Sequence, residues 1–235
     1  MKKHFLVFLL IAFCGCQSAY RLSVNKNLDA AYKTSVKDAS IAQPEEISTE
    51  LIRLTPDNTY LKRDEKGRFL MLTWTSWDGY TEKVGQEMTL SREVWATAVP
   101  EVKDFCQQVK PKNLDLRLEQ LMGLPPENGK TLFVELWVKP EDLFRPCPDP
   151  EVSDQTCEVN FPESPYLTLA EEHQKWITEL KSNSYGDTNG YPWTQLGYTY
   201  DWGNPKSEVG VSEFVIRGGA TVNVKAVYKT AVYCE

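Results

Sequence analysis

The sequence predicts an α+β fold with a mixed or mainly antiparallel sheet, about three helices and two disulfides. Strand-like segments outnumber helical ones, the helical segments lie between strands, and the C-terminal part of the chain is strand-like throughout. With 235 residues, of which 41% are hydrophobic, the chain can bury a sizeable core.

The first strands are expected between residues 69 and 99. Residues 69–77 are β-branched and aromatic, and Asp78-Gly79 offers a turn into residues 80–84, so we expect a hairpin there. A further strand is expected over residues 94–99, where Pro100 ends it.

The strongest strand signal lies at residues 131–139. Four apolar side chains alternate there and face one way: Leu132, Val134, Leu136 and Val138. Three more strand-like segments, separated by clusters of glycine and proline, follow near the C-terminus: residues 196–202, 212–217 and 221–233.

Three helices are expected between these strands. Pro100 suits the first position of a helix over residues 101–109. A second helix over residues 114–122 places its leucines on one face and stops at Gly123. The third, over residues 168–181, has an amphipathic pattern.

The N-terminus has the pattern of an export signal. Lys2 and Lys3 precede an apolar run at residues 5–14, and its ten residues are half of what a membrane-spanning helix needs. We therefore expect residues 1–15 to be a signal peptide that is removed from the mature protein.

The end of this signal, Phe13-Cys14-Gly15-Cys16, resembles the lipobox of bacterial lipoproteins. This resemblance implies cleavage after Gly15, a diacylglyceryl lipid on Cys16 and a membrane as partner through that anchor. The residue directly after this cysteine is Gln17 and not Asp. In this respect the chain resembles bacterial lipoproteins that are sorted to the outer membrane, where the cell has one. The alternative is an ordinary signal peptide cleaved elsewhere and a free exported protein.

The mature chain is expected to have two parts. Residues 16–66 are polar and poor in aromatics, which is typical of a lipidated N-terminus followed by a tether. Residues 67–235 are expected to form a single α+β domain.

The remaining cysteines predict two disulfides. Without Cys14 and Cys16 four are left, and an even number in an exported chain favours disulfides. The short loop between Cys147 and Cys157 makes them the natural local pair, which leaves Cys106 with Cys234. A zinc site is the alternative, but its close Cys-x-x-Cys pairs are absent, so we expect no metal.

Charge and motifs exclude several classes of function. The net charge of −7 gives no electrostatic footprint for nucleic acid. Only His173 remains after the signal is removed, and no G-x-S-x-G or H-E-x-x-H motif is present, so we expect His173 at the surface. The acidic loop with Asp149, Glu151 and Asp154 is expected to be solvated, because its spacing differs from that of a calcium loop.

The C-terminal part has an aromatic strand, a loop, and a glutamate that enters an apolar strand ending at Gly218-Gly219. This arrangement resembles the last motif of ADP-ribosyltransferase-like toxins. The resemblance implies NAD as substrate, Glu213 as catalytic glutamate, Thr199 as the small hydroxyl residue and Arg145 as the early arginine. The carboxylate would stabilise the charge that develops as nicotinamide leaves, and the arginine would hold a phosphate.

A second interpretation uses the aromatic residues of the same region as a stacking surface for a sugar or a protein partner. Four candidates lie there, Trp193, Tyr198, Tyr200 and Trp202, and the aromatic residues Trp74, Trp77 and Tyr80 of the first expected hairpin could add to the surface. In a third interpretation these rings fill the core.

We favour an exported, lipid-anchored envelope protein with a binding or structural role, without a cofactor and with an unknown protein or glycan ligand. The NAD-cleaving enzyme is the alternative.

Overall fold

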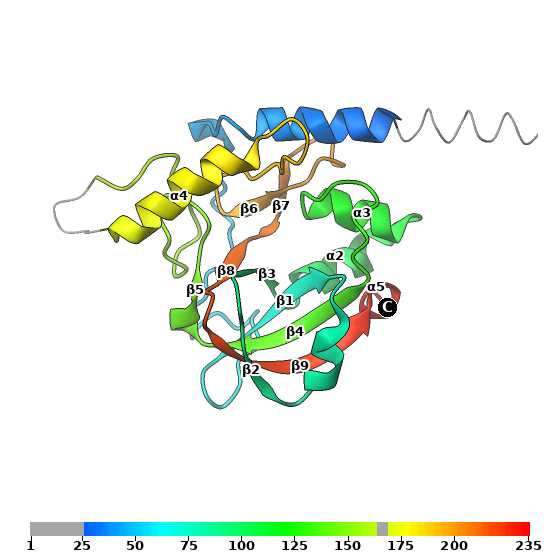
Figure 1. The fold of residues 1–235 in the computed structure, drawn as a ribbon, viewed down its shortest axis with the longest axis vertical. Coiled ribbons are helices and arrows are strands. Elements are labelled where there is room, and N and C mark those ends of the chain that lie inside the picture. Colours follow the sequence, from blue (N-terminus) through cyan, green and yellow to red (C-terminus); the bar gives the residue numbers. More distant parts are fainter. Residues whose placement is uncertain (1–25, 164–168) are drawn as a thin grey trace, which may run out of the picture.

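The computed structural model describes residues 26–163 and 169–235 (Figure 1). It confirms the α+β class: a seven-stranded antiparallel sheet has the order β2-β9-β4-β1-β3-β8-β5, and a two-stranded sheet pairs β6 with β7. The strands are β1 (Phe69–Thr75), β2 (Glu87–Thr89), β3 (Val94–Ala98), β4 (Leu132–Val138), β5 (Leu143–Phe144), β6 (Tyr198–Tyr200), β7 (Val209–Ser212), β8 (Phe214–Ile216) and β9 (Thr221–Lys229).

The helices lie around these sheets, and one of them precedes the first strand over residues 26–38. The α-helices that follow are α2 (Glu101–Val109), α3 (Leu114–Leu121), α4 (Glu171–Ser184) and α5 (Thr230–Tyr233). The described residues also form three 3₁₀ helices: η1 (Pro44–Glu46), η2 (Asp78–Lys83) and η3 (Pro140–Asp142).

The first expected hairpin is wrong. Residues 78–83 form η2 instead of a turn and a returning strand. β1 lies inside the sheet, where β3 takes one of its hydrogen-bonding edges and β4 the other, so no edge is left for the next segment of the chain. The last expected strand is also shorter than predicted, because its final residues form α5.

The seven-stranded sheet is buried on both faces. Successive residues of β1 alternate between two clusters: Met71 lies in one and Leu72 in the other. The cluster that contains Leu72 is covered by α2, α3 and α5, which contribute buried side chains such as Val102 and Leu118. We call the large sheet with α2, α3 and α5 the sheet region.

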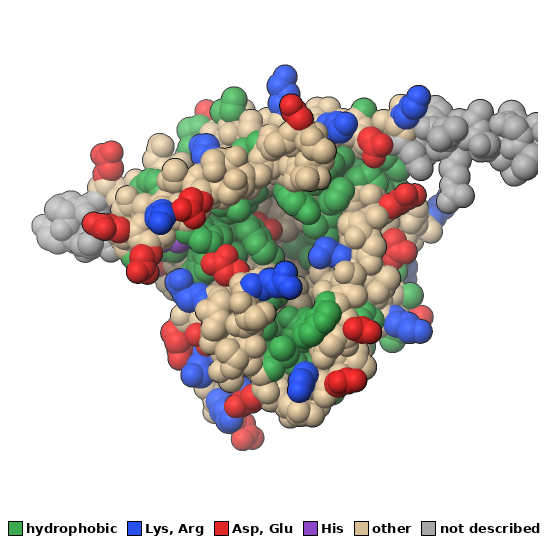
Figure 2. Space-filling view, in the orientation of Figure 1, with side chains coloured by type: hydrophobic (Ala, Val, Ile, Leu, Met, Phe, Trp, Pro, Cys, Tyr) green, Lys and Arg blue, Asp and Glu red, His purple; other side chains and the backbone are tan. Residues whose placement is uncertain are grey.

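A second set of segments packs on one end of the sheet region and is called the loop layer. It consists of residues 26–52, 145–163 and 169–213, and contains α4, β6 and β7 (Figure 1). Figure 2 shows this face hollowed between the two regions, with apolar side chains around the hollow.

The expected tether is folded against the protein where the structure describes it. Leu51, Leu54 and Leu61 are buried, and the first two belong to different hydrophobic clusters. The helix over residues 26–38 is docked as well, because its Tyr32 is buried and donates a hydrogen bond to the carbonyl of Gly190. The segment is polar in sequence, but several of its apolar residues fall at buried positions. The lipobox and residues 16–25 lie outside the described residues.

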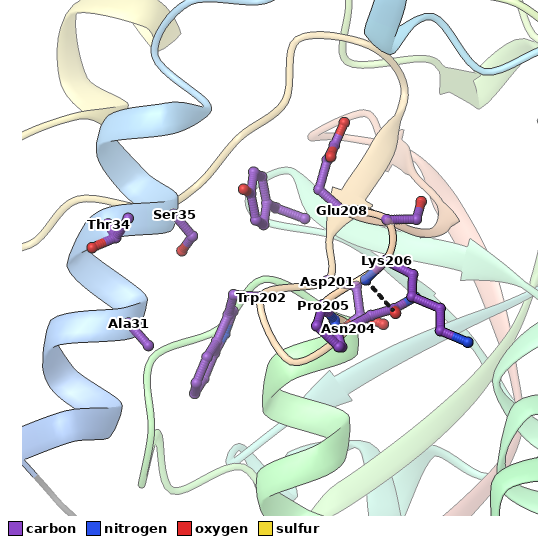
Figure 3. A pocket seen from close by; sticks show the side chains of 11 residues that line it. Ala31, Thr34, Ser35, Asp201, Trp202, Asn204, Pro205, Lys206 and Glu208 are labelled. Atoms are coloured by element: carbon purple, nitrogen blue, oxygen red, sulfur yellow. Dashed lines mark hydrogen bonds between the residues drawn. The ribbon is translucent and has the colours of Figure 1, made fainter.

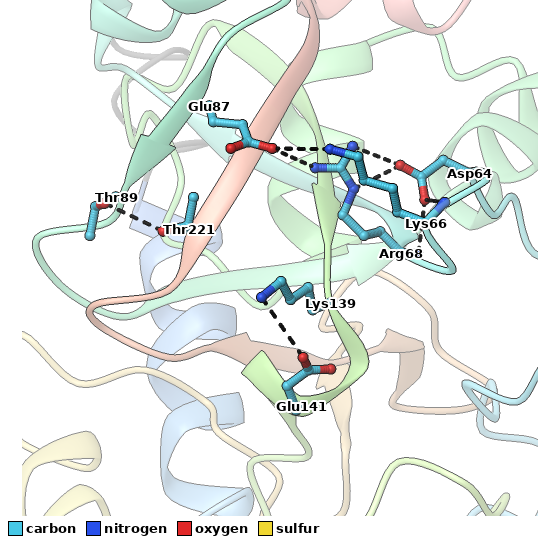
Figure 4. Close-up of polar contacts among 8 residues, drawn as sticks. All are labelled: Asp64, Lys66, Arg68, Glu87, Thr89, Lys139, Glu141 and Thr221. Carbon is cyan, nitrogen blue, oxygen red and sulfur yellow. Dashed lines mark hydrogen bonds and ion pairs between the residues drawn. The ribbon is translucent and has the colours of Figure 1, made fainter.

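The edge strand β2 is held by charged side chains (Figure 4). Glu87 forms ion pairs with Arg68 at 3.5 Å and Lys66 at 3.6 Å, and Arg68 also pairs with Asp64 at 2.7 Å. Charges of this kind discourage another strand from adding to a sheet edge.

Both predicted disulfides are present. Cys106 of α2 is linked to Cys234 after α5, and Cys147 is linked to Cys157 in the loop layer. Disulfides of this kind persist in oxidising, extracytoplasmic compartments. Among the described residues, no helix is both long and apolar enough to cross a bilayer.

Candidate binding site

The connection from β6 to β7, residues 201–208, is a turn that its own side chains hold. The Asp201 carboxylate accepts a hydrogen bond from the Gly203 N–H at 3.1 Å, and the Asn204 side chain accepts one from the Lys206 N–H at 3.1 Å. Short polar side chains favour turns because they satisfy nearby backbone donors. We call residues 201–208 the β6–β7 loop.

An ion pair fixes this loop to α3. Both guanidinium nitrogens of Arg117 donate to Asp201, at 2.8 and 2.6 Å, and the Asp201 side chain is 3% exposed. The guanidinium also lies 4.7 Å from the ring centre of Phe105 on α2. A bidentate pair with a buried carboxylate is geometrically specific, so it positions the loop against both helices.

A first pocket of about 450 Å³ lies between the helix over residues 26–38 and the β6–β7 loop (Figure 3). Ala31, Thr34 and Ser35 line it from the helix, and Trp202 stands opposite them. The Trp202 indole N–H is already bonded to the carbonyl of Leu124, so its ring is held in place. We call this the helix pocket.

A second pocket, of about 650 Å³, lies between α2, α3 and β7 and is called the α2 groove. It adjoins the helix pocket, because Asp201 and Asn204 line both. Its volume lies in the range of small-ligand sites. Three of its lining residues are large hydrophobic side chains that are exposed: Tyr60, Val109 and Val209.

Glu101 of α2 is the unusual carboxylate of this groove. One of its oxygens accepts a hydrogen bond from the Ser212 N–H at 2.8 Å, and the other accepts one from the Thr97 hydroxyl at 2.8 Å. Burial raises the pKa of Glu101 to about 7, although these hydrogen bonds and the charge of Arg145 act in the opposite direction. The carboxyl therefore changes charge near neutral pH.

Asp104 lies one turn further along the same helix. It accepts a hydrogen bond from the Tyr60 hydroxyl at 2.9 Å, which ties α2 to the segment before β1. Residues three apart on a helix are neighbours on its surface, so Glu101 and Asp104 line the same groove.

Arg145, expected as a phosphate-holding arginine, is fully buried instead. Its guanidinium donates hydrogen bonds to the backbone carbonyls of Ile52, Glu151 and Asp154, at 3.1 to 3.2 Å. It also lies 5.1 Å from the ring centre of Phe214. The side chain thus positions the loop between Cys147 and Cys157, called the disulfide loop, and a ligand cannot reach its buried guanidinium.

Thr199 and Glu213 are not placed together with Arg145 in either pocket. The Thr199 hydroxyl is buried between two backbone groups, because it donates to the carbonyl of Leu121 and accepts from the Val211 N–H. Glu213 is half-buried between β7 and β8, and burial raises its pKa to about 8. Neither of the two pockets of the described residues therefore brings these three residues together.

The four predicted stacking aromatics divide into two pairs. Tyr200 and Trp202 line the helix pocket. Trp193 and Tyr198 are buried, where the Trp193 indole N–H donates to the carbonyl of Pro146 and the Tyr198 hydroxyl donates to that of Glu46. Neither buried ring is free to stack on a ligand, because residues of the loop layer cover both.

His173 is buried and not at the surface as expected. Its ring nitrogen Nε2 lies 2.8 Å from the carbonyl oxygen of Cys147, and the ring stacks on Trp176. Burial lowers the pKa of His173 below its ordinary value. The side chain therefore connects α4 to the disulfide loop.

The groove residues Tyr60, Glu101, Asp104 and Arg117 were missed from the sequence. The i, i+3 spacing of Glu101 and Asp104 on the predicted helix is the signal that would have placed them on one face. Nothing in the pattern, however, indicates that Tyr60 and the β6–β7 loop close the groove around them.

No protein-family model matches this chain, and no match was found among curated proteins or among solved structures. Within residues 26–163 and 169–235, no group of three or more His, Cys, Asp or Glu side chains is placed to hold a metal ion.

Proposed function

We propose that the chain is an exported, lipid-anchored protein of the cell envelope that binds a protein or glycan ligand. The observation that carries the binding role is the pair of adjoining pockets around the β6–β7 loop. They combine exposed apolar and aromatic side chains with a few convergent polar groups, which is typical of ligand sites.

The location rests on two features of the chain. The two disulfides fit an oxidising compartment, and the lipobox-like sequence ending at Cys16 supports the anchor. The expected product is a mature protein that starts at Cys16 and is held on a membrane, in an outer membrane where the cell has one.

Binding accounts for the structure better than NAD cleavage. The enzymatic alternative needs an arginine that reaches a phosphate, and Arg145 is bonded to three carbonyls of its own chain. Tyr200 and Trp202, which the binding interpretation uses, both line a pocket.

The anchor is tested by mass spectrometry of the mature N-terminus. We expect a diacylglyceryl adduct on Cys16, and we expect Cys16→Ser to release the protein from the membrane fraction. An unmodified N-terminus at another residue would contradict the anchor and leave the binding role to its own test.

The binding role is tested by photo-crosslinking in the producing cell. A photo-reactive phenylalanine analogue replaces Tyr60 in the α2 groove or, as a control, Trp77, which is 52% exposed and lines neither pocket. Defined adducts are expected at Tyr60 alone. Equal labelling at both positions, or NAD cleavage that Glu213→Ala abolishes, would contradict the proposal.

A further inference from the structure

The α2 groove contains two carboxylates that form no salt bridge with the described residues, although the charge of the buried Arg145 acts on one of them, Glu101. Arg117 is the cationic residue among those that line it, and both of its terminal nitrogens are bonded to Asp201. Glu101 and Asp104 take part in none of the ion pairs of the described chain. The groove is therefore complementary to a ligand with a positive group.

The hydrogen bonds already made by the carboxylates favour an ammonium over a guanidinium. Each oxygen of Glu101 already accepts one hydrogen bond, and one oxygen of Asp104 accepts a bond from Tyr60. The carboxylates of Glu101 and Asp104 can each accept further hydrogen bonds. Neither carboxylate, however, has two oxygens without a hydrogen bond, which the two parallel N–H donors of an arginine guanidinium would need. An ammonium is compact and can direct its three N–H donors to separate carboxylates.

The rim of the groove suits an alkyl stem. Tyr60 is 40% exposed and Val109 is 47% exposed, and both line the groove beside the two carboxylates. A lysine side chain packs its methylene groups along apolar surface while its charged end reaches polar groups.

We propose that the α2 groove binds a lysine side chain of a protein partner. The ammonium lies between Glu101 and Asp104, and the methylene stem packs against Tyr60 and Val109. This assignment names the ligand chemistry of the proposed binding function and rests on it.

The proposal is tested by calorimetry with the full mature protein. The probes are a hexapeptide with one central lysine between apolar residues, the same peptide with Nε-acetyllysine, and the same peptide with arginine. We expect acetylation to weaken binding at least about tenfold, since it removes the charge, and arginine to bind more weakly than lysine.

The variant for this test is Glu101→Gln with Asp104→Asn. In Glu101→Gln the amide oxygen still accepts from the Ser212 N–H, and the amide N–H donates to the Thr97 hydroxyl, which then acts as acceptor. Asp104→Asn keeps an oxygen that accepts from the Tyr60 hydroxyl. The matched control is Glu171→Gln with Glu172→Gln, which removes the same charge from an exposed turn of α4. We expect the groove variant to lose the preference for lysine over acetyllysine and the control to keep it.

A pH series gives an independent measurement. Glu101 faces the donors Thr97 and Ser212, the charge of Arg145, and the groove residues Asp104, Asp201 and Arg117. Because its pKa is raised to about 7, the groove gains negative charge between pH 6 and pH 8. We expect affinity for the lysine peptide to rise over this range in the native protein and to stay flat in the groove variant.

The lysine assignment is overturned if the acetylated peptide binds as well as the lysine peptide, or if the groove variant keeps the full preference. Affinity that falls from pH 6 to pH 8 would also overturn it. The photo-crosslinking and the mass of the mature N-terminus are measured separately, so a failure here leaves the proposed function standing with another ligand.

Discussion

The sheet region and the loop layer are stabilised by different kinds of contact. The large sheet is stabilised by apolar side chains on both faces, and β4 and β1 pair along their full length. The loop layer instead depends on buried polar groups that bond to backbone carbonyls far away in the sequence, among them Arg145, Tyr198 and Trp193. Both pockets include residues of the loop layer, so the less regular part of the molecule supplies much of the candidate site.

Removing each disulfide is expected to cause the largest losses of unfolding free energy, and it tests whether the two regions differ. Replacing Cys106 and Cys234 by alanine opens a loop with a separation of 128 residues, for which chain entropy predicts a loss of about 5 kcal/mol. Replacing Cys147 and Cys157 opens a separation of 10, and the expected loss is about 3 kcal/mol. Urea unfolding of both double variants measures the two losses.

Hydrogen exchange shows where each loss occurs. Without Cys147–Cys157 we expect amides of the loop layer to lose protection while those of β1 and β4 keep it, because local unfolding follows the contacts that are removed. Uniform loss across both regions would show that they unfold as one unit and would contradict the distinction.

Arg145 is expected to have the next largest effect. Arg145→Met keeps much of the apolar stem but leaves the carbonyls of Ile52, Glu151 and Asp154 without their donor. Since each unsatisfied buried group costs about 1–3 kcal/mol, we expect a loss on the order of 4 kcal/mol. Chemical denaturation checks the value.

The matched control is Arg217→Met. Arg217 is exposed and its guanidinium lies 4.6 Å from the ring centre of Phe144, so it also contacts an aromatic ring. The expected loss is about 1 kcal/mol or less. Similar losses for Arg145 and Arg217 would show that the three carbonyl contacts contribute little.

The sequence predicts the elements of the sheet region better than the contacts of the loop layer. The alternation at residues 131–139 places β4, and the proline and leucine pattern places α2 and α3, because local periodicity reflects which face is buried. The position of Arg145 could not be predicted, because its partners lie up to 93 residues away. Polar contacts over such separations leave no periodic signal.

The candidate site was predicted only in part for this reason. Tyr200 and Trp202 lie in the helix pocket as the aromatic pattern suggested, but Trp193 and Tyr198 have the same residue types and are buried. Tyr198 is bonded to Glu46, in a segment whose polar composition concealed its packing. Trp193 is bonded to Pro146 and stacks on Tyr185, contacts that no local pattern indicates.

Glu213 gives a pH-dependent effect at the junction of the two regions. Its pKa is about 8 in the folded protein and near 4.5 in an unfolded chain, so the folded state holds a proton that the unfolded state has released. Stability therefore falls as pH rises from about 4.5 to 8. Glu213→Gln removes this fall, and we expect its Tm to exceed that of the native protein by roughly 10 °C at pH 8 but not at pH 4.

Calorimetric melting at both pH values measures this effect. Glu172→Gln on the exposed face of α4 is the control, and its Tm difference from the native protein should be the same at pH 4 and pH 8. A Glu213→Gln variant that behaves like this control would show that water reaches the Glu213 carboxylate in the folded protein.

The smallest effect concerns how the helix over residues 26–38 is held. The Tyr200 hydroxyl donates to the Asp38 carboxylate at 2.7 Å in an exposed position, whereas the buried Tyr198 donates to the partly buried carbonyl of Glu46. Removing an exposed donor lets water replace it, but removing a buried one leaves its acceptor unsatisfied. We expect a loss of about 0.5 kcal/mol for Tyr200→Phe and about 1–2 kcal/mol for Tyr198→Phe, measured by urea unfolding. Equal losses for the two variants would mean that water is excluded from the helix pocket as it is from the interior of the loop layer. In that case the helix over residues 26–38 would have to move before a ligand could enter the pocket.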